Sequence, residues 1–251
     1  MIIRLVIGFS LFFISCNSSP EKETDYTETF SLNDFYSSDE SLNKMVEEIF
    51  NDLDPKERIA QMIVVAAGTT GKPTKTVDKL IRKKAIGGVL MLSGEKDQII
   101  KLVHRFDSLS FQYGLLPLIY SSDAEPSLIN RKIKGTQIVP KTVELETIEI
   151  CDSVTQIISN ELLSMGIKYN FAPVVDLSPN NEAITNRTFG NDSVMVVSLS
   201  DAFIRASRKR GVAATAKHFP GHGLVSGDTH NQLVTIDGEM KEVRNYIPLI
   251  E

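Results

Sequence analysis

Reactive side chains gather in one short segment, residues 217–230. It reads Lys-His-Phe-Pro-Gly-His-Gly at 217–223 and Gly-Asp-Thr-His at 227–230, and it holds three of the chain's four histidines. An apolar run at Val212–Thr215 comes directly before it. Strands of α/β enzymes deliver catalytic groups from their C-terminal ends onto loops of this kind. The segment is therefore the first candidate for an active site.

A zinc site is one chemistry that this segment could support. Its candidate ligands are His218, His222, Asp228 and His230. No two of them stand at H-x₃-H spacing on a predicted helix, and Lys217 beside His218 would repel a cation. We therefore predict no metal, with a metal-dependent hydrolase as the alternative.

Size and charge limit what the chain could be. Its 251 residues suffice for one large α/β domain or two small ones. The net charge is −5, and no basic run longer than three residues is present. Nucleic-acid binding needs a basic surface, so we expect no nucleic-acid partner.

The N-terminus has the features of an export signal. An apolar run at Leu5–Ile14 is too short to span a bilayer. The sequence Phe13-Ile14-Ser15-Cys16 resembles a bacterial lipobox. We expect residues 1–16 to be a lipoprotein-type signal peptide, with Cys16 lipidated and anchored in a membrane of the cell envelope. A plain secretory signal with an incidental cysteine is the alternative, and the protein is exported in both cases.

The remaining chain divides into a tether and a folded domain. Residues 17–40 are polar and lack a sustained period, so we expect a tether there. Residues 41–251 are expected to form the domain. Cys151, in a helical pattern, has no second cysteine to pair with once Cys16 is lipidated, so no internal disulfide is expected.

Within the domain, short apolar runs alternate with amphipathic stretches. The runs are typical of strands buried on both faces, and the stretches have helical period. The predicted strands are Met62–Ala67, Gly88–Leu92, Pro117–Ser121, Asn170–Asp176 and Val212–Ala216, with a sixth candidate at Gln232–Ile236. The predicted helices are Leu42–Leu53, a helix starting at Asp54-Pro55, Thr76–Lys84, Lys96–Tyr113, Val143–Met165 and Val194–Arg210. This alternation indicates a parallel sheet.

Two architectures share that pattern: a doubly wound open sheet and a (β/α)₈ barrel. No G-x-G-x-x-G or Walker loop follows any strand, which disfavours the nucleotide-binding sheet. Polar residues instead follow several strands, namely Asp123, Asp176, Lys217 and His218. We therefore predict a (β/α)₈ TIM-type barrel, incomplete because only five or six βα units can be counted.

Four motifs make the chain resemble the N-terminal barrel domain of glycoside hydrolase family 3, most closely its bacterial β-N-acetylhexosaminidases. The first is residues 217–223 together with Asp228-Thr229-His230. The others are Asn170–Asp176, Asn186–Gly190, and Ser122–Glu125 with Arg131 after it. The resemblance runs from about Asp54 to the end of the chain.

The resemblance implies a retaining hydrolase of terminal β-linked N-acetylglucosamine that needs no cofactor. His230 would be the acid/base, assisted by Asp228. A carboxylate two residues away can orient a histidine and stabilise its protonated form, and a neutral histidine is a competent base near pH 7. The second group that this mechanism needs is a nucleophile. In the family it is an aspartate on a later strand, which would lie beyond Glu251.

The resemblance also implies sugar-binding roles for Asp123, Arg131, Arg187, Lys217 and His218. Carboxylates accept from vicinal hydroxyls, and guanidinium groups donate in a fork. An ion pair with a neighbouring acid is the alternative for Arg187. Pro126-Ser127 stand where the family usually has two glycines, so this loop is expected to follow a different path.

Cell-wall fragments are the expected substrate class. Two further functions stay open. One is a β-glucosidase of the same family. The other is a sugar-binding lipoprotein without catalytic activity.

Overall fold

The computed structural model describes residues 39–178, 181–229 and 231–250. Four predictions therefore fall wholly or mostly outside the described residues: the signal peptide, the lipidation of Cys16, the tether, and the position of His230. Among the described residues, none of the helices is both long and apolar enough to cross a bilayer.

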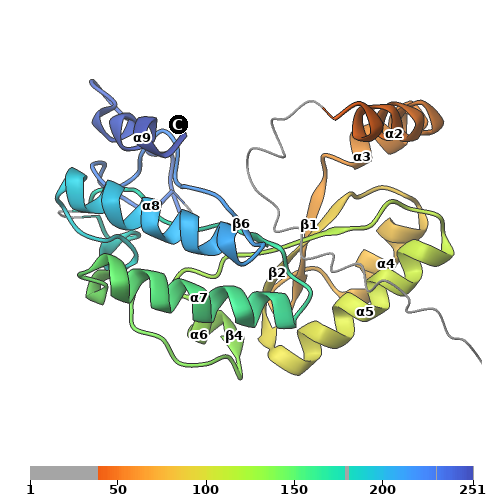
Figure 1. Cartoon of the computed structure of the whole chain (residues 1–251), viewed down its shortest axis with the longest axis horizontal. Helices are drawn as coiled ribbons and strands as arrows, with labels where there is room; N and C mark the ends of the chain where they lie inside the picture. Colours follow the sequence, from red (N-terminus) through yellow and green to blue (C-terminus); the bar gives the residue numbers. More distant parts are fainter. Residues whose placement is uncertain (1–38, 179–180, 230, 251) are drawn as a thin grey trace, which may run out of the picture.

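The centre of the fold is a parallel sheet whose main path follows the order of the strands in the chain (Figure 1). Its main path runs β1 (Val64–Gly68), β2 (Gly88–Glu95), β3 (Ile119–Ser122), β5 (Tyr169–Asn170) and β6 (Ala213–Ala214). A short strand, β4 (Ile133–Lys134), pairs with the end of β2. A doubly wound sheet reverses its strand order at a switch point, whereas this order runs in one direction, as in a barrel. The fold is an incomplete TIM-type barrel.

Helices connect successive strands and cover the sheet. The α-helices are α2 (Glu40–Asp52), α3 (Pro55–Ala60), α4 (Thr74–Arg82), α5 (Lys96–Gln112), α6 (Ile129–Lys132), α7 (Ile148–Ser164), α8 (Ser193–Lys209) and α9 (Ile247–Ile250). Three 3₁₀ helices are η1 (Thr142–Glu144), η2 (Thr185–Arg187) and η3 (Lys241–Asn245). Helices α4 and α5 pack together, and α7 packs against α8 on the other flank (Figure 1).

Local sequence explains where these helices begin. Asp54 accepts hydrogen bonds from the Lys56 and Glu57 amides, and Glu57 accepts one from the Asp54 amide, which forms a capping box at α3. Thr147 caps α7 by accepting a hydrogen bond from the Ile150 amide. The predicted helix Val143–Met165 therefore starts later than expected, after a separate 3₁₀ turn at η1.

The core lies between the sheet and the helices. Val89 and Met91 of β2 are fully buried, as are Phe106 of α5 and Phe203 of α8. The α7 stripe that the sequence predicts is also buried, including Cys151, Val154, Ile158 and Leu162. The side chains of β2 are buried or half-buried on both faces up to Gly94, which agrees with a strand that is covered on both faces.

Five predicted strands are present, but the later ones are short. β5 has only two residues, and the chain beyond it makes a single isolated bridge between Val174 and Lys217. Pro173 has no amide to donate to a ladder. The prediction of a sixth strand at Gln232–Ile236 is wrong, because these residues form no strand and Leu233 is exposed. The sequence patterns also missed α6 and β4.

Candidate functional site

A cavity of about 600 Å³ opens at the C-terminal ends of the strands. It is lined by side chains from several loops, among them Asp123, Arg131, Arg187, Lys217, His218 and Asp228. All six were predicted as site residues from the sequence. Volumes of this size are typical of small-molecule sites. The structure thus brings together every described member of the predicted site.

Asp123 sits between two ammonium groups at one wall of this cavity. Lys217 Nζ donates to Asp123 Oδ1 at 2.6 Å, and Lys132 Nζ donates to Oδ2 at 2.6 Å. Burial alone would raise the pKa of Asp123, but the two ammonium groups outweigh it and lower that pKa to about 2. Asp123 is therefore a carboxylate at any ordinary pH, able to accept hydrogen bonds from sugar hydroxyls.

Glu125 forms a buried ion-pair network beneath Asp123. Its side chain is only 1% exposed, and Arg187 binds it in a fork at 2.8 and 2.7 Å. Lys217 Nζ lies 2.5 Å from Glu125 Oε1, so Lys217 is shared by two carboxylates. The ion pair that the sequence left open for Arg187 is thus present, with Glu125 as its partner. Arg187 also lines the cavity, so pairing with Glu125 holds the guanidinium in place at its wall.

Asp176 organises the two histidines next to Lys217. It is fully buried, accepts from His218 Nδ1 at 2.6 Å and accepts from the His222 backbone amide at 2.9 Å. A carboxylate only accepts, so Nδ1 of His218 carries a proton, and in the neutral ring Nε2 is the acceptor. Arg187 Nη2 lies 3.4 Å from that Nε2. This geometry gives Asp176 a structural role in the segment that follows β5.

The α6 turn, which was not predicted from the sequence, places Lys132 rather than Arg131 against Asp123. Lys132 makes the ion pair, while Arg131 lines the cavity as an exposed side chain. Adjacent residues of a helix point in directions about 100° apart, so the side chains of Arg131 and Lys132 point to different sides of the turn. The turn starts after Pro126, where the Glu125 carbonyl accepts from the amides of Leu128 and Ile129. Sequence reasoning missed Lys132.

Asn170 was also missed, and it holds the strand end that carries Asp123. Asn170 lies on β5, is 1% exposed and exchanges two hydrogen bonds with Ala124. Its Oδ1 accepts from the Ala124 amide at 2.9 Å, and its Nδ2 donates to the Ala124 carbonyl at 3.2 Å. Neighbouring strand ends are thereby tied together directly below the cavity.

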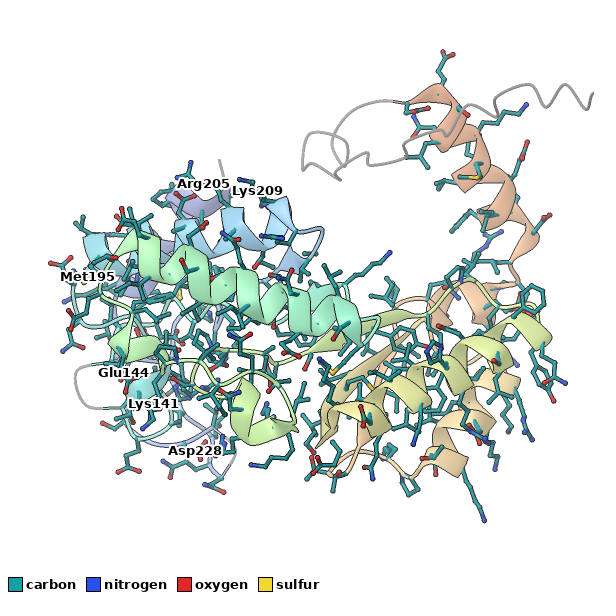
Figure 2. The ribbon with its side chains drawn as sticks, turned by 60° about the horizontal axis from the view of Figure 1, so that its bottom comes forward. Lys141, Glu144, Met195, Arg205, Lys209 and Asp228 are labelled. Atoms are coloured by element: carbon teal, nitrogen blue, oxygen red, sulfur yellow. The ribbon has the colours of Figure 1, made fainter. Side chains whose placement is uncertain are left out.

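Asp228 reaches the cavity from the long loop after β6. Figure 2 shows it at the edge of the molecule opposite Arg205 and Lys209, which lie on α8. Asn231 Nδ2 donates to its carboxylate at 3.1 Å. The Oγ1 atom of the neighbouring Thr229 lies 3.1 Å from His222 Nε2, and this contact holds the loop against His222. His230, the predicted acid/base, is not among the described residues.

The geometry bears on the zinc alternative. Among the described residues, no group of three histidine, cysteine or acidic side chains is arranged to hold a metal ion. His218 donates from Nδ1 to Asp176, and its Nε2 faces the Arg187 cation. Burial lowers the pKa of His222, whose Nε2 contacts Thr229. His218 and the Nε2 atom of His222 are thus engaged with protein groups.

Comparison with known proteins agrees with these motifs. Residues 55–247 match the family model described as the glycosyl hydrolase family 3 N terminal domain. This chain belongs to glycoside hydrolase family 3. The matched range includes every strand of the sheet and all residues of the cavity.

Individual relatives within the family are similar over much of the chain. A beta-hexosaminidase of Hydrogenovibrio crunogenus is 30% identical over 181 residues, 66% of this chain and 50% of that protein. Beta-hexosaminidase LpqI of Mycobacterium tuberculosis is 31% identical over 195 residues, 73% of this chain and 47% of that protein. The chain thus spans about half the length of these relatives.

Among solved structures, a family 3 beta-N-acetylglucosaminidase from Paenibacillus sp. superposes with a TM-score of 0.70 at 30% identity. The match covers 77% of this chain and 39% of that protein. The sheet and its helices are therefore arranged as in a family 3 enzyme.

Proposed function

We propose that this chain supplies the sugar-binding and acid/base half of a retaining glycosidase that removes terminal β-linked N-acetylglucosamine. The observation that carries the proposal is the charged wall of the cavity, in which Asp123, Lys217 and Arg187 are held in fixed positions by one another and by Glu125. The names of the relatives support the choice of sugar. Cell-wall glycans are the proposed substrate class.

Binding would begin with the terminal sugar seated against this wall. Asp123 is ionised and can accept from two vicinal hydroxyls, while Lys217 and the Arg187 fork can donate to others. Their mutual ion pairs fix the side chains before the sugar arrives, which reduces the entropy lost on binding. His218 Nε2, an acceptor at the cavity wall, is placed to receive a further hydroxyl.

Proton transfer is assigned to His230 with Asp228. In the first step the protonated histidine would give its proton to the leaving oxygen, and in the second it would take one from water. The carboxylate of Asp228 would stabilise the imidazolium between these steps. Asp228 lines the same cavity as the proposed sugar-binding residues. His230 is included in the proposal because it follows Asp228 by two residues in the sequence.

The covalent step requires a carboxylate nucleophile on the opposite face of the sugar. We propose that this group is the family's aspartate on a later strand, beyond Glu251. Asp123 does not fit that task, because each of its oxygens accepts from an ammonium group at 2.6 Å. Its role is to bind.

We further propose that the protein is exported and anchored at Cys16 to a membrane of the bacterial envelope. The apolar run at Leu5–Ile14 and the polar residues after Cys16 support this. Radiolabelled palmitate incorporated into the expressed protein, and lost in Cys16→Ala, would support it. Equal incorporation in both would reject it.

Turnover of two aryl glycosides tests the proposed activity. The full-length protein is expected to release nitrophenol from the N-acetyl-β-glucosaminide much faster than from the β-glucoside. A His230→Ala variant should lose most of this activity, by a factor of about 10² to 10⁴. The reverse preference would favour the β-glucosidase. Sugar binding without any turnover would favour the binding protein, and loss of activity with a chelator would favour the metal-dependent hydrolase.

A further inference from the structure

Glu242 is a buried carboxylate that lies behind the cavity rather than in it. It belongs to η3 (Lys241–Asn245), late in the described chain, and is 3% exposed. A buried ionisable group is costly unless its hydrogen-bonding capacity is satisfied. The partners of Glu242 are backbone amides, and these amides belong to the two segments that carry the site.

The first segment follows β5 and contains Asp176. The Leu177 amide donates to Glu242 Oε1 at 2.5 Å. The second segment is the loop of residues 217–224. There the Leu224 amide donates to Oε2 at 3.3 Å, and the Gly223 amide also binds the carboxylate. One side chain therefore joins the loop to the strand end.

Two glycines allow this close approach. A Cβ added at Gly223 would stand 1.2 Å from the Leu177 carbonyl oxygen and 2.7 Å from Glu242 Oε1. A Cβ at Gly221 would stand 2.6 Å from Glu242 Oε2. The loop backbone is packed directly onto the carboxylate, with no room for a side chain between them.

Asn245, at the end of η3, holds the same strand end from the other side of Asp176. Its Nδ2 donates to the Val175 carbonyl at 2.9 Å, and its Oδ1 accepts from Ser193 at 2.5 Å. Both neighbours of Asp176 are thus fixed by η3. Asp176 in turn orients the His218 ring and binds the His222 amide.

We propose that Glu242 is a positioning residue that holds the loop of residues 217–224 against Leu177 and thereby sets the Asp176–His218 pair. The effect on sugar binding rests on the proposed function, whereas the effect on the loop does not. Glu242 is not among the residues that line the site cavity, and its hydrogen-bond partners are backbone amides, so its action passes through the backbone.

Amide hydrogen exchange in the full chain tests this directly. In Glu242→Ala, the Leu177, Gly223 and Leu224 amides should exchange at least about tenfold faster, since each loses a charge-assisted bond. Amides of β2, such as Val89, should keep their protection. Exchange in Glu242→Gln should be intermediate between Glu242→Ala and the unmodified chain, because the carbonyl oxygen of the glutamine side chain still accepts a hydrogen bond. Glu239→Ala, an exposed acid in the same region, is the matched control and should match the unmodified chain.

Two exchange results would overturn the proposal: unchanged exchange at the three amides in Glu242→Ala, or an equal increase across the whole chain that Glu242→Gln does not reverse. The same variants are titrated with N-acetylglucosamine, and affinity should fall about tenfold in Glu242→Ala, with partial recovery in Glu242→Gln. If the unmodified chain binds no sugar, the proposed function fails while the exchange result still decides the role of Glu242.

Discussion

Lys217 Nζ lies 2.5 Å from Glu125 Oε1 and thereby joins the strand end after β6 to the strand end after β3. The contact is largely shielded from solvent, since the Glu125 side chain is 1% exposed and that of Lys217 is 12% exposed. Arg187 makes a second ion pair to Glu125. The charged side chains of the cavity wall therefore form one connected ion-pair network. A substitution in this network should affect both the stability of the fold and sugar binding.

Removal of Glu125 should be strongly destabilising. In Glu125→Ala, Arg187 and Lys217 lose a buried partner, and breaking such a pair costs about 3–5 kcal/mol. Urea unfolding followed by circular dichroism measures this loss. Glu239→Ala removes an exposed carboxylate and should change stability by less than about 1 kcal/mol. Equal, small effects in both variants would show that the buried pair contributes little.

Asp123 should make stability depend on pH at the acid end. Its pKa in the folded chain is about 2, below its ordinary value of 3.8. A lowered pKa stabilises the fold above pH 3.8, and that contribution is lost as the pH falls towards 2. The amount is on the order of 2 kcal/mol. In Asp123→Asn, unfolding between pH 4 and 2 should show a smaller slope; an unchanged slope would reject the assignment.

Lys132 and Arg131 should differ in their effect on the sugar site. Lys132 pairs with Asp123, so Lys132→Met should raise the pKa of Asp123 and weaken N-acetylglucosamine binding several-fold. Arg131→Met removes an exposed side chain at the same cavity and should weaken binding less. Calorimetric titration of the two variants decides between them. A larger loss in Arg131→Met would favour the role that the family resemblance implies.

Gly223 should tolerate no side chain. A Cβ there would stand 1.2 Å from the Leu177 carbonyl oxygen, so the loop must move away from Glu242. We expect Gly223→Ala to cost about 3 kcal/mol in stability. Gly114→Ala is the opposite case, because the backbone of Gly114 is left-handed (φ +63°) but a Cβ there would meet nothing within 4 Å. Thermal unfolding of both separates close contact from backbone strain.

Periodicity predicted most of the architecture. The apolar runs at 62–67 and 88–92 became β1 and β2, and the stripe through Cys151 and Ile158 became the buried face of α7. These features are local, since a strand buried on both faces and an amphipathic helix each carry their own pattern. The placement of Asp123, Lys217 and His218 after strands follows from the same pattern, whereas their sugar-binding roles were implied by the family resemblance.

The residues that the sequence did not reveal act over long distances in the chain. Glu125, Asn170 and Glu242 hold the site through partners on other elements. No local pattern in the sequence around these three residues predicts those partners. Lys132 was missed because a four-residue helix leaves no periodic pattern. The error at Gln232–Ile236 arose because a short apolar alternation also occurs in exposed loops.

The central claim is that the cavity bounded by Asp123, Lys217 and Asp228 binds N-acetylglucosamine. The most direct measurement is a titration of the purified chain with this sugar, followed by two-dimensional NMR. We predict saturable shifts in the amides of Asp123, Lys217 and His218, with glucose binding more weakly and Asp123→Ala abolishing the shifts while the fold persists. Absence of shifts, or equal shifts in Asp123→Ala, would contradict the account.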